Sequence, residues 1–287
     1  MIPTSYFEPQ LACTRNAYWL IFILLFTVSQ HANALHSDCQ NKSSPEQQSQ
    51  DVLNVNLTGI GIVTIWGVAN WDYFQNSPKS ASEDWFQNNT DSGGADKIGH
   101  LYSSYVTTHA LSHLYETWCM HENDAALYGA LSSLAIHGYM EIGDSFSSYG
   151  FSHEDMIANS IGSLLGYYLY TNPELANKID LRWEYGLHPN HRDVTTDYEN
   201  SKYLLALKLN GFDSFRHSFL KHIELQLGYY TRGFDDPLNT KERNMFFGIG
   251  INLTDLFRRH DYKKTATVLK YIQIPGTNVE FDKDKNK

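Results

Sequence analysis

Five ionisable side chains in the middle of the chain have the types and spacing that metal or acid–base chemistry needs. Asp96 and His100 are four residues apart, so a helix places them about 40° apart on one face. Glu141 and Asp144 share a face of a second helical segment, and Asp155 lies on a third. If the three faces meet, four carboxylates and an imidazole converge, and their pKa values must separate because like charges repel in a partly dry space.

Three interpretations of this cluster are open. As a metal site, it offers carboxylate oxygens and an imidazole, which suit a divalent ion such as Zn²⁺, Mn²⁺ or Fe. As a metal-free site, a carboxylate pair does general acid and base work, with His100 as the proton carrier. As a structural network, Asp96 caps its own helix and Asp155 completes a capping box with Ser152. The candidate metal ligands are Asp96, His100, Glu141 and Asp155, and the candidate catalytic residues are these four together with Asp144.

The elements that position these residues are predicted to be three consecutive helices, over residues 95–119, 123–145 and 153–170, because their apolar residues recur with helical spacing. Gly162 and Gly166 share the helix face of Asp155. Small side chains let helices approach closely, so the three polar faces are expected to meet inside the bundle.

Beyond Asp197 the apolar period changes from helical to alternating, which predicts an antiparallel meander of about four strands over residues 197–282. We therefore expect an α+β fold, a small helical bundle followed by a sheet whose apolar face covers the bundle or meets the outer membrane. In the second strand this predicts that Leu225 is buried and Gln226 is exposed. The alternating residues are Tyr203, Leu205, Leu207 and Leu209, then Ile223, Leu225, Leu227 and Tyr229, then Met245, Phe247, Ile249, Ile251 and Leu253, with short strands expected at 271–274 and 279–281.

The first 34 residues have the pattern of a signal peptide. Arg15 precedes an apolar run of about a dozen residues, too short for a hydrocarbon core that needs roughly 20. Ala32 and Ala34 are small residues at the positions a signal peptidase reads, so cleavage is expected after Ala34. Residues 35–56 are then predicted to be a solvated linker, because Ser, Gln and Asn dominate there without an apolar period.

The cysteines bear on export and lipidation. Removal of the signal peptide with Cys13 leaves Cys39 and Cys119, which either form a disulfide in an oxidising compartment or remain free thiols. His36 lies at the third position before Cys39, where lipid attachment requires an apolar residue, so lipidation there is not favoured.

Residues 57–180 form the predicted helical domain, which opens with a second apolar stretch at 57–69. This stretch contains Gly59, Gly61 and Gly67 and is shorter than a membrane span. We expect it to be a buried helix, with a buried strand as the alternative.

Two further observations exclude classes of function. The net charge of -10 excludes nucleic acid as a partner, because phosphate binding needs clustered Lys and Arg. His109 and His113 have metal-ligand spacing with Glu116, but His109 lies about 180° from His100 on one helix, so surface histidines are expected. Neither histidine is followed by the glutamate that an H-E-x-x-H zinc protease needs.

Four short motifs carry a resemblance to a known family. They are Asp96-Lys97-Ile98-Gly99-His100, Glu141-Ile142-Gly143-Asp144, Gly150-Phe151-Ser152-His153-Glu154-Asp155 and Ala158-Asn159-Ser160-Ile161-Gly162. In this order they resemble the YfiM-like family of periplasmic lipoproteins and, more distantly, the VanZ-like membrane family. The resemblance covers about a quarter of the chain and implies an envelope location and a shared polar cluster, but no reaction.

The sequence thus predicts an exported protein of the periplasm or the outer-membrane periphery, with a metal-binding or acid–base hydrolytic site between three helices. The alternative is a non-catalytic structural protein that contacts lipid or a membrane through its C-terminal strands. Substrate, metal identity and protein partners do not follow from the sequence.

Overall fold

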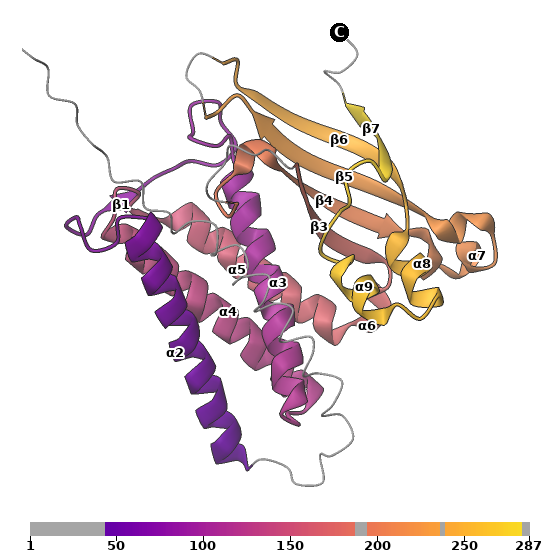
Figure 1. Ribbon diagram of the computed structural model, residues 1–287, viewed down its shortest axis with the longest axis horizontal. Coiled ribbons are helices and arrows are strands. Elements are labelled where there is room, and N and C mark those ends of the chain that lie inside the picture. Colours follow the sequence, from indigo (N-terminus) through magenta and orange to yellow (C-terminus); the bar gives the residue numbers. More distant parts are fainter. Residues whose placement is uncertain (1–43, 187–193, 236–238, 283–287) are drawn as a thin grey trace, which may run out of the picture.

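The computed structural model describes residues 44–186, 194–235 and 239–282, and it has the predicted α+β architecture. The long helices form one part of the molecule, and an antiparallel sheet with short helices beside it forms the other (Figure 1). The predicted signal peptide and Cys39 lie outside the described residues. The helices are α2 (Pro45–Asn70), α3 (Ala95–Thr117), α4 (Glu122–Ser145), α5 (His153–Thr171), α6 (Pro173–Ala176), α7 (Asp213–Arg216), α8 (Leu253–Arg259) and α9 (Lys263–Val268).

The three predicted helices are confirmed as α3, α4 and α5, each within two residues of its expected ends. They pack against one another as a bundle. Gly162 on α5 lies against the backbone of α3, since a Cβ atom there would be 2.1 Å from the carbonyl oxygen of Leu101. The small residues thus allow the close helix approach on which the polar cluster depends.

Helix α2 corrects two expectations. The linker predicted over residues 35–56 is helical from Pro45, because Ser44 accepts a hydrogen bond from the amide of Gln47 and proline is favoured in the first turn. The apolar stretch 57–69 is helical but is not buried: of α2 only Gly67 is buried. By length and composition alone, α2 is long and apolar enough to cross a membrane, and only 6% of its most apolar window is buried.

The sheet is a meander, as predicted, in the order β3-β4-β5-β6-β7 with every neighbouring pair antiparallel. Strand β3 was not predicted and begins inside the interval assigned to the helical domain. A separate two-stranded parallel sheet joins β1 (Ser80–Ala81) to β2 (Phe151–Ser152). The strands of the meander are β3 (Ile179–Tyr185), β4 (Ser201–Lys208), β5 (Ile223–Arg232), β6 (Glu242–Ile251) and β7 (Asn278–Asp282).

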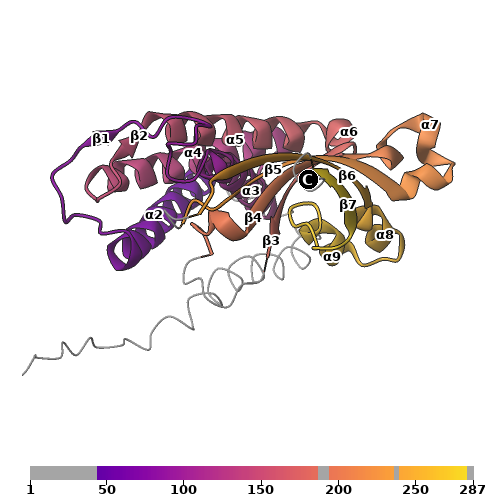
Figure 2. The ribbon, with the colours of Figure 1, turned by 90° about the horizontal axis from the view of Figure 1, so that it is seen from above.

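The prediction of which face of the sheet is buried is wrong for most of its area. Gln226 is 1% exposed, whereas its neighbour Leu227 is 50% exposed. The buried face carries an ionic network in which Arg182 donates to Glu224 at 2.6 Å and to Asp180 at 2.8 Å. Lys208, which is fully buried, donates to the same aspartate at 2.6 Å. Helices α8 and α9 lie under this concave side of the curved sheet (Figure 2).

The opposite face of the sheet meets the bundle along β3 and β4 and, at Tyr229, along β5. There Leu181 packs with Tyr105 of α3 and Leu169 of α5, and the Tyr102 hydroxyl donates to the carbonyl of Tyr271 at 2.6 Å. This junction fixes the bundle against the sheet. Beyond this junction the outer face of the sheet is exposed to solvent, as at Leu227, Phe247 and Val279.

Candidate functional site

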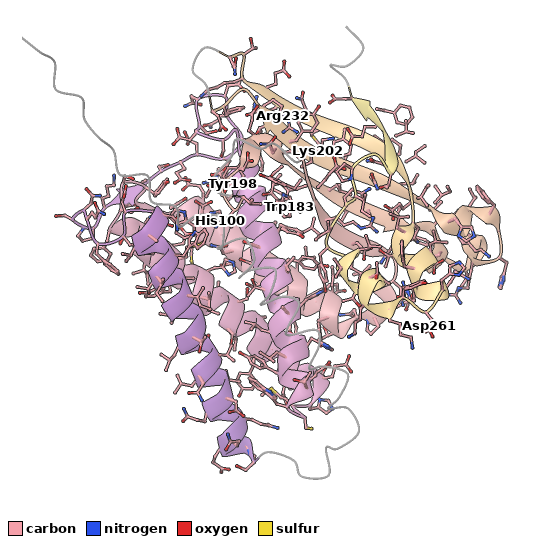
Figure 3. The ribbon with its side chains drawn as sticks, in the orientation of Figure 1. His100, Trp183, Tyr198, Lys202, Arg232 and Asp261 are labelled. Atoms are coloured by element: carbon pink, nitrogen blue, oxygen red, sulfur yellow. The ribbon has the colours of Figure 1, made fainter. Side chains whose placement is uncertain are left out.

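The predicted cluster lies at the N-terminal end of α3, where helices α3, α4 and α5 meet. His100 Nδ1 is 3.5 Å from Glu141 Oε1, and His100 Nε2 is 3.8 Å from Asp155 Oδ1. Glu141 and Asp155 are buried, whereas His100 keeps 16% of its side chain exposed. Figure 3 shows His100 and Tyr198 together near this end of α3. One residue from each helix thus reaches the same small volume.

Lys97 occupies the centre of the acidic half of the cluster, a role that the sequence analysis missed. Its ammonium is 2.7 Å from Asp96 Oδ2 and 2.9 Å from Asp155 Oδ1, and it also pairs with Glu83. The Lys97 side chain is only 2% exposed. The aspartate–lysine pair at the start of the first motif was the available signal. Glu83 precedes α3 in an irregular segment, and no periodicity pointed to it.

A hydrogen-bond chain runs from the cluster into the bundle. The Asn159 amide donates to Glu141 Oε1 at 3.1 Å, and its oxygen accepts from the Ser104 hydroxyl at 2.8 Å. The same oxygen is 3.3 Å from His100 Nδ1, which donates to it in the Nδ1-protonated tautomer. That tautomer leaves His100 Nε2 as a lone-pair donor on the side of Asp155.

Not every oxygen of the cluster is satisfied. Asp96 Oδ1 is buried and accepts no hydrogen bond within the described residues. Asp155 Oδ1, by contrast, lies 2.9 Å from the Lys97 ammonium, and Lys97 and Glu83 both interact with this carboxyl. A purely structural network is expected to satisfy an atom such as Asp96 Oδ1, since unsatisfied buried polar groups are costly. This observation favours a site that takes up a further cation or proton.

Burial and mutual repulsion shift the pKa values of the carboxyl groups apart. Burial, together with the charge of Asp155, raises the pKa of Glu141 to about 9. Burial raises the pKa of Glu83 to about 7, although Lys97 opposes the shift. Burial also acts on Asp96, but the neighbouring Lys97 outweighs it and lowers the pKa of that carboxyl. Burial lowers the pKa of His100, so its imidazole is neutral at pH 7.

Asp144 lies one helical turn from Glu141 and takes a different partner. It interacts with the hydroxyl of Tyr73, a residue that follows α2 and packs on Gly67 and Gly143. Burial raises the pKa of Asp144 to about 7, which the tyrosine hydrogen bond opposes and the charge of Asp155 supports. The structure therefore brings Asp96, His100, Glu141 and Asp155 together, and it places Asp144 beside them against Tyr73.

The capping roles considered for the aspartates are only partly present. Gly94 is the N-cap residue of α3, and no side chain caps that helix, so Asp96 is not its cap. Ser152 accepts a hydrogen bond from the amide of Asp155 at 3.2 Å, as in a capping box. The carboxylate of Asp155 pairs with Lys97, so this side chain belongs to the cluster and does not cap α5.

The expectation that His109 lies on the surface is wrong. His109 is 8% exposed, and its ring nitrogens lie 2.8 Å from the Tyr271 hydroxyl and 3.0 Å from the Gly166 carbonyl. Burial lowers its pKa to about 4, so it is a neutral residue of the junction between bundle and sheet. His113 is exposed, as expected, with 54% of its side chain accessible.

Among the residues that the structure describes, two sets of ligand atoms come within 4.8 Å of one another, and each could hold an ion. One set is His100, Glu141 and Asp155; the other is Glu83, Asp96 and Asp155. The second set already surrounds the Lys97 ammonium. The first set has one ligand from each helix and a neutral imidazole, and it is the better candidate for a metal ion.

Comparison with known proteins agrees with the location expected for the chain. Residues 82–171 match a family described as predicted periplasmic lipoprotein (DUF2279). The matched segment contains all five predicted site residues and covers less than half of the chain. It supports an exported, periplasmic location, whereas the finer YfiM-like and VanZ-like resemblances stay predictions. No curated protein and no solved structure matches the chain.

A disulfide is consistent with this location. Cys119 is disulfide-bonded, whereas its pairing with Cys39 stays a prediction. Disulfides persist in oxidising compartments such as the periplasm. The two other cysteines of the chain, Cys13 and Cys39, lie outside the described residues.

Proposed function

We propose that the protein is a cell-envelope protein that binds one divalent metal ion between α3, α4 and α5, through His100, Glu141 and Asp155. The observation that carries the proposal is the convergence of these three ligand atoms within 4.8 Å from three different helices. The residues fit such an ion. The imidazole is neutral, and both carboxyl groups have raised pKa values, so a cation would relieve their repulsion.

The proposed reaction class is hydrolysis. A bound divalent ion would supply a polarised water and a Lewis acid. Lys97 holds Asp155 in place by its charge, and Asn159 orients Glu141 through a hydrogen bond of 3.1 Å. Glu83 is 29% exposed, and with a pKa of about 7 it can exchange a proton with solvent at neutral pH.

A second candidate is acid–base catalysis without a metal, and one observation favours it. The Lys97 ammonium already provides a positive charge to Glu83, Asp96 and Asp155. In that case Glu83 and Asp144, whose pKa values are both about 7, are the groups that gain and lose protons.

Zinc titration of the full chain after chelation, followed by calorimetry at several pH values, tests the proposal. We expect one site, with proton release on binding because the ion displaces the proton held by Glu141. Glu141→Gln should abolish binding, and His113→Gln, an exposed histidine outside the cluster, should not. Absence of binding at every pH would leave the metal-free candidate.

Export rests on the sequence pattern and on the family match. We propose that residues 1–34 are removed and that the mature chain begins at Leu35. N-terminal sequencing of protein from the envelope fraction tests this. A chain that retains Met1 would contradict it.

A further inference from the structure

The outer face of the sheet is almost entirely apolar. Cross-strand partners keep the odd-numbered residues of all five strands on this face, as in the register Leu225–Ile249–Val279. Eight of these side chains are at least 40% exposed, although each belongs to a regular strand. They are Leu205, Leu227, Met245, Phe247, Ile249, Ile251, Val279 and Phe281.

The same strands turn charged and polar residues inward. Arg182, Glu224 and Gln226 are each at most 2% exposed, and the arginine and the glutamine both donate to Glu224. A water-soluble sheet normally buries its apolar face and exposes its polar face. A sheet that faces lipid has the opposite pattern: along each strand, apolar residues that point outward alternate with polar residues that point inward.

The helical part continues the apolar surface. Ile157, Ile161, Leu164 and Tyr168 form a stripe along α5, and each is at least 47% exposed. The stripe lies opposite the residues of α5 that are buried against α3. Figure 2 shows α5 on the side of the molecule toward which the sheet is convex, away from α8 and α9. The stripe and the outer sheet face thus point in the same general direction.

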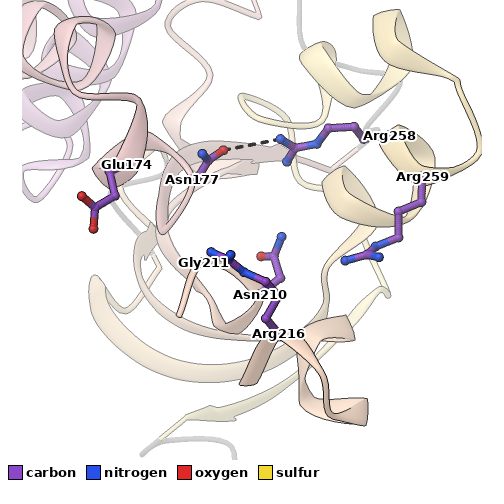
Figure 4. Close-up of a pocket in the computed structure, with 7 residues that line it drawn as sticks. All are labelled: Glu174, Asn177, Asn210, Gly211, Arg216, Arg258 and Arg259. Atoms are coloured by element: carbon purple, nitrogen blue, oxygen red, sulfur yellow. Dashed lines mark hydrogen bonds between the residues drawn. The ribbon is translucent and has the colours of Figure 1, made fainter. Parts of the chain in front are cut away.

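The end of the sheet at which α8 and α9 lie is basic, in a protein whose net charge is -10. Residues 253–270 carry five Lys or Arg and two Asp. A cavity of about 240 Å³ at this end is lined by Arg216, Arg258 and Arg259 together with Glu174 (Figure 4). Arg216 pairs with Asp213 and Arg259 with Asp255, whereas Arg258 donates to Asn177 at 3.4 Å. Close by, Phe219 is 76% exposed. An exposed aromatic side chain at the basic end of a protein matches the boundary between acyl chains and anionic headgroups.

We propose that the convex face of the sheet, together with the outer stripe of α5, docks on a phospholipid surface, with the three-arginine cavity at the headgroups of anionic lipids. This surface is distinct from the metal site, which lies inside the bundle, and the two proposals stand or fall separately. A second copy of the chain is the competing occupant. It would explain an apolar patch, but the basic end complements an anionic lipid surface and not another basic end.

Lipid photolabelling of the full chain tests the docking. The chain is reconstituted in vesicles of phosphatidylethanolamine and phosphatidylglycerol that contain a phospholipid with a photoreactive acyl chain, and the labelled peptides are identified by mass spectrometry. We expect label in the peptides of β5, β6 and β7 and in α5. Label confined to α2, or to residues before it, would overturn the proposal.

Two variants sharpen the result. Phe247→Asp, at a position that is 46% exposed, should leave the fold intact and reduce labelling of the strand peptides by about tenfold, as the loss of one buried aromatic side chain implies. Asn123→Asp, at an exposed position in the first turn of α4 outside the proposed surface, is the matched control and should change nothing. Labelling of α2 serves as the internal reference in both.

Charge and self-association are tested separately. Arg258→Glu with Arg259→Glu should weaken labelling in anionic vesicles by about fivefold per residue, and replacing the lipids with phosphatidylcholine should have a similar effect. Analytical ultracentrifugation of the chain without vesicles tests whether a second copy covers the apolar face. A dimer that Phe247→Asp dissociates, with no label on the strands, would overturn lipid docking in favour of self-association.

Discussion

Lys97 Nζ lies 2.9 Å from Asp155 Oδ1 inside the helical bundle, with the lysine side chain only 2% exposed. This pair joins α3 to α5 at the point where the candidate metal ligands meet. A buried ammonium among carboxylates is tolerated because its neighbours offset the loss of hydration. Desolvation lowers the pKa of Lys97, but the charges of Asp96 and Asp155 raise it by more than desolvation lowers it. The lysine is therefore charged at neutral pH.

Replacing Lys97 should therefore expose the repulsion between the carboxylates. We expect Lys97→Met to lower the unfolding free energy by about 3–5 kcal/mol, the usual cost of leaving one partner of a buried ion pair alone. Added zinc should restore part of the loss, because Glu83, Asp96 and Asp155 would then form a second ligand set. Lys178→Met is the control. Its partner Glu174 is 88% exposed, so the change should be at most about 1 kcal/mol.

Glu141 gives the bundle a pH dependence. Its folded-state pKa of about 9 is above the ordinary value of 4.5, so near neutral pH the folded chain holds a proton that the unfolded chain releases. The stabilisation is complete below pH 4.5 and is lost as pH rises toward 9. We expect Glu141→Gln to match the wild type near pH 5 and to be more stable near pH 9 without metal.

Urea unfolding between pH 5 and 9, in the presence of a chelator, measures this effect. Glu83, His100, Asp144 and Asp155 also titrate in the cluster, so the informative quantity is the difference between the variant and the wild type. A purely structural network predicts a loss of about 1–3 kcal/mol in Glu141→Gln at every pH. That result would remove the support for a functional site.

The inverted sheet predicts an unusual response to charge. Gln226→Asp should lower the unfolding free energy by about 3 kcal/mol, since a carboxylate would replace a buried amide that donates to Glu224 at 2.7 Å. Leu227→Asp, at an exposed position, should change it by less than about 1 kcal/mol in the absence of lipid. Thermal unfolding of the two variants compares them. Greater damage from Leu227→Asp would contradict the orientation of the sheet.

Close helix packing predicts that Gly162 holds the site together. Gly162→Ala would press a Cβ atom on the α3 backbone and should cost about 1–3 kcal/mol. Because the same contact sets the separation of α3 and α5, zinc affinity should fall as well. Gly61→Ala on α2 meets nothing within 4 Å and should be stabilising by about 1 kcal/mol. An unchanged zinc affinity in Gly162→Ala would contradict the claim that the close packing of α3 and α5 positions the metal ligands.

The sequence predicted the helices of the bundle closely, because helical period and caps are local properties. The polar faces of the three helices could be predicted to meet because the ionisable residues lie at helical spacing with small residues on the same face. These residues are Asp96, His100, Glu141 and Asp155. Lys97 was overlooked as a partner because one residue along a helix is a turn of 100°, and only its long side chain reaches back to the carboxylates. The position of Glu83 depends on the path of an irregular segment, and the spacing of apolar residues does not predict that path.

The strands were predicted from alternation, but alternation does not say which face is covered. Leu225 and Gln226 illustrate the error: the usual rule buries the leucine, whereas α8 and α9 cover the side of the glutamine. Those two short helices follow the third predicted strand, and their packing is a tertiary property. Strand β3 alternates too, with Asp180, Arg182 and Glu184 between apolar residues, and the signal was available but was not used.

The metal content of the full chain, purified from the envelope fraction without chelator and equilibrated with zinc, tests the central claim most directly. Elemental analysis should find about one divalent ion per wild-type chain, none in His100→Ala or Glu141→Gln, and an unchanged content in His113→Gln. A wild-type chain without metal, or equal metal in all four proteins, would contradict a site formed by His100, Glu141 and Asp155.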